Sequence, residues 1–172
     1  MLRWFLHRKL DGQEKLLGES MDYLRFVLDR SPAKFLRFAS IMPFANSRRR
    51  LPAEAWYVAQ IVAMKREDCG PCLQITVNLA AQDNVDRQLL RNVLAADYNV
   101  LTQELKDVAD FTESVVTSMD DDELRGRVLQ HYGEQGLIEM SYAIASSRIP
   151  PTVKRTLGFA KSCKLVSVEV PA

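Results

Sequence analysis

Hydrophobic residues recur at three- and four-residue steps along most of the chain, which is the spacing of an amphipathic α-helix. The pattern is clear over 13–28, where Leu17, Met21, Leu24 and Leu28 follow it. The same spacing predicts helices over 53–66, 85–94, 102–119 and 137–145, and others that begin near Pro32, Pro71 and Asp120. The segment 165–170 alternates between apolar and polar residues as a short strand does. The patterning therefore predicts an all-α fold with one strand at most.

Prolines and acidic residues mark where these helices begin and end. A proline lies at three of the predicted helix starts, where its missing N–H group costs least. The acidic run 120–123 also suits a helix start, because the N-terminal end of the helix dipole is positive. Pro150 and Pro151 predict a break, since proline interrupts the hydrogen bonding inside a helix. A last helix is then expected over 152–160.

The composition fits one helical domain. Of the 172 residues, 47% are hydrophobic and 26% are charged, so the chain can bury a core and stay soluble. We expect a single domain over 1–172, with an N-terminal helical extension over 1–50 and a core segment over 51–96. The longest apolar run is far short of a transmembrane segment, and a signal-peptide pattern is missing. We therefore expect a cytoplasmic protein.

The formal net charge of +1 conceals three blocks of opposite sign. The charge is +6 over 1–50, −9 over 51–147 and +4 over 148–172. A basic segment can bind nucleic acid, but no aromatic platform is interleaved with the basic residues, so we expect no nucleic-acid partner. Complementary blocks are more typical of contacts within a chain or between its copies. They favour a homo-oligomer, for which a dimer, a trimer and a hexamer all stay open.

The strongest chemical signal is the pair Cys69 and Cys72, separated by Gly70-Pro71. A structural zinc site would need two further ligands. The only other candidates are Cys163, His7 and His131, scattered along the chain, so we expect no metal. Redox chemistry fits the pair better. At a helix N-terminus the backbone N–H groups stabilise a thiolate, and one turn between the sulfurs lets them close a disulfide.

The tetrad Cys69-Gly70-Pro71-Cys72 matches the active site of thioredoxins, and 149–152 imitates the proline turn that faces it there. A thioredoxin, however, needs a buried strand that leads into the motif. Here 53–66 has the periodicity of a helix instead. The cysteine pair is therefore expected between two helices, with Asp68 or Cys69 as the N-cap of the second.

A helix followed by Cys-x-x-Cys at the next helix start, in an all-helical chain of this length, resembles the carboxymuconolactone decarboxylase-like superfamily, in its alkylhydroperoxidase D-like (AhpD-like) branch. The resemblance is clearest over 51–96, and a weaker one extends to Cys163. It implies an all-α homo-oligomeric helical bundle that reduces peroxides with a cysteine pair. It also implies a dithiol or thioredoxin-like electron donor and no bound cofactor. The branch's proton-relay histidine and glutamate are replaced here by Thr76 and Tyr57.

The resemblance implies that Cys72 attacks the peroxide and Cys69 resolves the product, whereas the helix-dipole argument alone favours Cys69 as the attacking thiol. Proton transfer to the leaving group calls for a carboxylic acid near the sulfurs. Glu67, two residues before Cys69, is one candidate, although a solvated helix-end residue is an equally good interpretation. Glu134 is the second candidate, although a cap or dipole partner of the helix that begins near Gly133 is the more ordinary interpretation.

These observations predict a thiol-dependent peroxidase, an oxidoreductase of antioxidant defence with Cys69, Cys72, Glu67 and Glu134 as its catalytic residues. One alternative is a redox-sensing or assembly protein without significant turnover, which would dock through its basic N-terminal segment. Another is a cofactor-free decarboxylase like the members that give the superfamily its name. Such an enzyme does not need redox-active cysteines.

Overall fold

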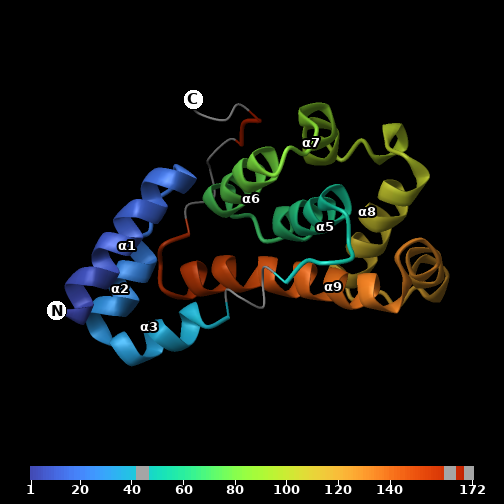
Figure 1. The fold of residues 1–172 in the computed structure, drawn as a ribbon. Coiled ribbons are helices and arrows are strands. Elements are labelled where there is room, and N and C mark those ends of the chain that lie inside the picture. The colour runs from blue at the N-terminus through green and yellow to red at the C-terminus, as the bar shows by residue number, and fades with distance from the viewer. Residues whose placement is uncertain (42–46, 161–165, 169–172) are drawn as a thin grey trace.

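The computed structural model describes residues 1–41, 47–160 and 166–168, and these form helices without a strand among them (Figure 1). The helices are α1 (Leu2–Leu17), α2 (Asp22–Arg30), α3 (Pro32–Ala39), α5 (Ala53–Lys65), α6 (Gly70–Gln82), α7 (Arg87–Leu94), the 3-10 turn η1 (Tyr98–Val100), α8 (Gln103–Val116) and α9 (Asp122–Thr156). The all-α prediction is confirmed. None of the helices in these ranges is both long and apolar enough to cross a membrane.

Helix α5 is the centre of the core. Its residues 55–59 and 61–64 are all buried, and it packs against α6, α7, α8 and α9. A helix that is apolar on every side is stable only when other elements surround it, and Figure 1 shows α5 enclosed by its neighbours. Three alanines of α5 are fully buried, which lets the neighbouring helices approach closely.

The N-terminal helices α1, α2 and α3 form a separate layer on one side of this core (Figure 1). Leu10, Met21, Leu28 and Phe35 form its own small hydrophobic cluster, and α1 connects the layer to α6. The single helix predicted over 13–28 is wrong. The chain leaves α1 at Gly18, whose φ of 69° is the left-handed conformation that commonly ends a helix.

The segment before α5 is fastened to α9 by one carboxylate. Glu139 accepts hydrogen bonds from the backbone N–H groups of Arg49, Arg50 and Leu51, at 3.0, 2.9 and 2.8 Å. Burial opposes the charged form of Glu139, but these N–H groups hold its pKa below the ordinary value. The start of α5 is thereby fixed against the middle of α9.

Helix α9 begins as the acidic run predicts, because Asp121 is its N-cap and accepts a hydrogen bond from the backbone N–H of Leu124 at 2.9 Å. It bends at Gly133, whose φ and ψ of 68° and 178° are not helical. The predicted break at 150–151 is wrong, and the helix continues to Thr156.

Contacts on both sides of the two prolines explain why α9 continues. Arg148 and Arg155 both pair with Glu67, so each side of the proline step is tied to the turn between α5 and α6. These tertiary contacts offset the two backbone hydrogen bonds that the prolines cannot donate. The segment 166–168 is not a strand, and the rest of the predicted strand lies outside the described residues.

The bend at Gly133 gives a prediction for stability. Gly133→Ala should lower the free energy of unfolding by about 1–3 kcal/mol, because only glycine adopts this backbone conformation without strain. Gly126→Ala is the matched control in the same helix. Its Cβ would meet no atom within 4 Å, so it should raise stability by about 0.5–1 kcal/mol. Urea denaturation of both variants tests this, and equal effects of the same sign would contradict it.

Candidate active site

The cysteine pair lies at the junction of α5 and α6. After α5 the chain turns through Arg66 to Asp68, and α6 begins at Gly70 with Cys69 as its N-cap. Pro71 occupies the first turn of α6. Both features confirm the prediction from the sequence. The Cα atoms of Cys69 and Cys72 are 5.3 Å apart, and the two sulfurs are joined as a disulfide.

Both cysteines are buried. Cys69 is 2% and Cys72 is 4% exposed, and they pack with Met64 and Leu73 in a small hydrophobic cluster. A reagent in bulk solvent therefore has little direct access to either sulfur. What can reach the pair depends on the space around it.

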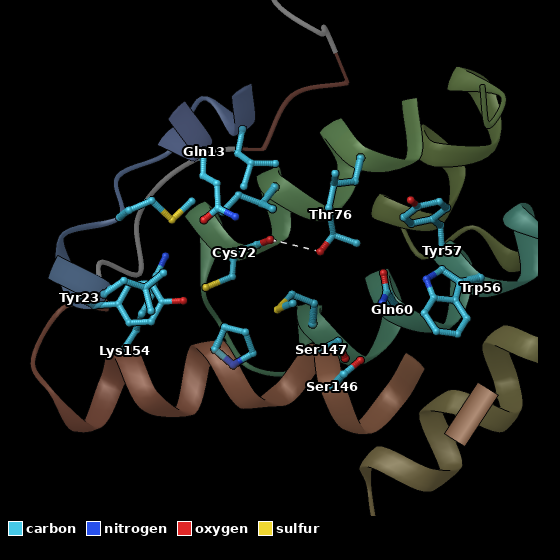
Figure 2. A pocket seen from close by; sticks show the side chains of 17 residues that line it. Gln13, Tyr23, Trp56, Tyr57, Gln60, Cys72, Thr76, Ser146, Ser147 and Lys154 are labelled. Atoms are coloured by element: carbon cyan, nitrogen blue, oxygen red, sulfur yellow. Dashed lines mark hydrogen bonds between the residues drawn. The ribbon is translucent and has the colours of Figure 1, made fainter. Parts of the chain in front are cut away.

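A cavity of about 200 Å³ reaches the pair at Cys72. Its lining includes Cys72 but not Cys69, and comes from α1, α2, α5, α6 and α9. In Figure 2, Cys72 on α6 lies across the cavity from Ser146, Ser147 and Lys154 on α9. The sequence alone could not decide which cysteine is the attacking thiol. In the structure the two differ in their surroundings, because only Cys72 lines the cavity.

Glu67, the first predicted acid, lies beside the cysteine turn and is 7% exposed. One carboxylate oxygen accepts from Arg148 Nε at 2.7 Å, and the other is 3.4 Å from Arg155 Nη1. Arg155 also donates to the backbone oxygen of Glu67. The carboxylate is engaged by two guanidinium groups and is not among the cavity residues. Its contacts fix the turn before Cys69.

Glu134, the second predicted acid, is exposed and directly follows the bend at Gly133. Twelve residues of α9 separate it from Ser146 at the cavity, a distance of about 18 Å at the helical rise of 1.5 Å per residue. The structure does not bring Glu134 to the cysteine pair.

Tyr57 and Thr76, which stand at the relay positions of the resembled branch, both line the cavity. The phenol of Tyr57 donates to Asp83 at 2.9 Å, and burial together with this carboxylate raises its pKa. The hydroxyl of Thr76 donates to the backbone oxygen of Cys72 at 3.3 Å. Neither side chain carries a proton that it would release readily at neutral pH.

Lys154 is the cavity residue that sequence reasoning missed. It is 5% exposed, and its Nζ atom lies 5.0 Å from the centre of the Tyr23 ring. Burial lowers the pKa of Lys154, an effect that the charge of Glu19 opposes. Burial also raises the pKa of Tyr23 to about 12. The spacing of three and four residues places Ser147, Pro150 and Lys154 on one face of α9. The sequence indicates this shared face only if the helix continues through the prolines.

The histidine His131 serves a different part of the fold. Its Nε2 atom lies 3.0 Å from Asp107, a carboxylate on α8 that is 1% exposed. Asp107 also accepts hydrogen bonds from Gln103 and Arg127. Burial acts against the charge of Asp107, but these partners lower its pKa overall. The group joins α8 to α9.

No cluster of three or more His, Cys, Asp or Glu side chains suited to a metal ion occurs in the ranges that the structure describes. Cys163 lies outside those ranges. No protein-family model, curated protein or solved structure matches this chain.

The Glu67 contacts predict a stability effect. Glu67→Gln removes the charged partner of two arginines and should lower the free energy of unfolding by about 1.5–3 kcal/mol. Asp110→Asn, which breaks an ion pair with Lys106 on the surface of α8, is the control and should cost less than about 1 kcal/mol. Guanidinium denaturation under reducing conditions compares the two. Equal costs would show that the Glu67 contacts do not hold the turn.

Proposed function

We propose that this protein is a thiol-dependent peroxidase that reduces hydroperoxides through Cys69 and Cys72. The observation that carries the proposal is that both cysteines lie at disulfide distance at the start of α6, and that one of them lines a cavity. The N-terminus of α6 favours a thiolate there, and the cavity gives a peroxide a route to it.

The reaction balances with two cysteine thiols and one hydroperoxide. The Cys72 thiolate attacks the terminal oxygen of the peroxide, the O–O bond breaks, and an alkoxide leaves and takes a proton from water. Cys72 is now a sulfenic acid. The Cys69 thiol then attacks the Cys72 sulfur, the S–O bond breaks, and hydroxide leaves as water with the Cys69 proton. An external dithiol reduces the disulfide and is itself oxidised to a disulfide.

The order in which Cys72 attacks is supported by its place in the cavity. Cys69 is the less exposed of the two and is not a cavity residue, so a peroxide in the cavity meets Cys72 first. A second thiol that is close and shielded suits the resolving role. This assignment agrees with the one that the family resemblance implies.

Burial of both sulfurs favours a small electron donor. A dithiol of low molecular weight fits a route through the cavity, whereas a thioredoxin-like protein would need α1 and α2 to move away. We therefore propose a small dithiol as the electron donor.

A redox sensor is the second candidate function. The observation that favours it is that residues of α1 and α2 line the same cavity as Cys72, so the N-terminal layer faces the space that the sulfur shares. A sensor would change its elution volume in size-exclusion chromatography when the pair oxidises, and would show negligible peroxide turnover. A peroxidase would consume peroxide continuously while dithiol lasts.

Single substitutions test the peroxidase. Cys69→Ser and Cys72→Ser should each lower the dithiol-dependent consumption of hydroperoxide at least about 100-fold, because each step needs its own thiol. Cys163→Ser is the matched control and should retain turnover. Consumption is followed by a colorimetric peroxide assay with dithiothreitol as donor. Turnover retained by both single variants would rule out the proposed function.

A further inference from the structure

The side chain of Lys154 is buried, and Glu19 is the charged group that acts on it. It is 5% exposed, and among the described residues its ammonium group makes neither a hydrogen bond nor an ion pair in direct contact. Its Nζ atom lies 5.0 Å from the centre of the Tyr23 ring. A buried charge is costly unless it is paired. Among the described residues every fully buried polar side-chain atom has a hydrogen-bond partner, so the Lys154 nitrogen, which has none, keeps some exposure to the spaces that its side chain lines.

Lys154 stands at the boundary between two spaces. Together with Tyr23 it lines the cavity of about 200 Å³ that Cys72 shares, which we call the inner cavity, and a second space of about 450 Å³. The second space is also bordered by Glu19 and Asp22. Figure 2 shows Lys154 beside Tyr23 at one end of the inner cavity, with Tyr57 and Trp56 at the other.

The inner cavity is mostly apolar. Leu17, Leu24, Ile75 and Leu79 contribute to its walls, together with the ring of Trp56. A dry apolar cavity of about 150 Å³ holds one benzene molecule. The inner cavity, at about 200 Å³, therefore has room for a chain of about six to eight carbon atoms.

We propose that this cavity binds a carboxylate with a short or medium apolar chain, with the chain in the inner cavity and the carboxylate on Lys154. The carboxylate of the ligand pairs with the buried ammonium, and its apolar chain contacts the apolar walls. One ammonium matches one carboxylate, and the nearby carboxylates of Glu19 and Asp22 repel a phosphate dianion more strongly than a monoanion.

The carboxylate site also defines a substrate class for the reaction at Cys72, and this extension of the proposal rests on the proposed function. A peroxide held by Lys154 carries its own carboxylate, so the substrate is a hydroperoxy carboxylic acid. Reduction gives the hydroxy acid and water, with both electrons supplied by the cysteine pair. The carboxylate itself does not react.

Calorimetric titration with octanoate and with octanol tests the binding site. Octanoate should bind one per chain and about 10–100-fold tighter than octanol, because a hydrogen bond between charged groups adds to the same chain contacts. Lys154→Met should weaken octanoate to the affinity of octanol and leave octanol unchanged. Lys154→Arg should retain the preference, and Lys34→Met, on the exposed surface of α3, should change nothing.

The pH dependence follows from the burial of Lys154, which lowers its pKa, while Glu19 acts in the opposite direction. Asp22, Tyr23, Tyr57 and Cys72 are the other titratable groups that line the spaces around it. Octanoate affinity should fall as the pH rises through the lowered pKa of Lys154, before ordinary lysines lose their protons. Octanol affinity should not follow this change.

Equal affinities for octanoate and octanol, or an unchanged octanoate affinity in folded Lys154→Met, would overturn the carboxylate site. Circular dichroism establishes that each variant is folded. Ile75→Phe, which fills part of the cavity, should weaken both ligands, and an unaffected affinity would place them elsewhere. Octanoate binding requires no redox step. Binding without peroxide turnover would reject the proposed function alone, and turnover without binding would reject the carboxylate site alone.

Discussion

The ion pairs between Glu67 and two arginines of α9 are the contact on which the site depends. Glu67 is buried in the turn that leads to Cys69, and Arg148 and Arg155 reach it from positions seven residues apart on one helix. The turn is thereby fixed against the part of α9 that carries Ser147 and Lys154. Buried carboxylates are stable when charged partners surround them. Glu67, which the sequence names as a candidate acid, anchors this turn to α9 in the structure.

The cavity lies where three layers of helices meet without filling the space between them. Helix α5 supplies a fully packed centre, α6 begins beside it with the cysteine pair, and α9 passes across both. The N-terminal helices then cover the remaining side, where Leu17 and Tyr23 complete the wall. Because the prolines of α9 cannot donate to the carbonyls of Ser146 and Ser147, the helix has polar backbone atoms without helical partners at this point. The walls are otherwise mostly apolar, so Lys154 is the prominent charge that a ligand would meet.

Much of the fold could be predicted from the sequence, because helical periodicity is a local property. The start of α6, with Cys69 as N-cap and Pro71 in the first turn, and the start of α9 at the acidic run near Asp121 follow from capping chemistry alone. The single helix predicted over 13–28 missed a local signal, the left-handed Gly18, whereas the other failures arise because local rules ignore tertiary contacts. Pro150 and Pro151 predict a break in the helix, and only the arginine contacts to Glu67 show why α9 continues. That error concealed Lys154, since its alignment with Ser147 requires an unbroken helix. Glu134 looked suitable by residue type but lies too far along α9, a distance that the sequence could not supply.

We propose that Cys69 and Cys72 form a reversible redox pair that hydroperoxide oxidises. Intact mass after alkylation in denaturant measures this directly: the protein is first reduced and freed of reductant, then kept with or without one equivalent of an organic hydroperoxide. Peroxide-treated protein should accept two fewer alkyl groups than untreated protein. Peptide mapping should place the two missing groups at Cys69 and Cys72, and dithiothreitol should restore alkylation at both. Full alkylation of both cysteines after peroxide treatment, or loss confined to Cys163, would contradict it.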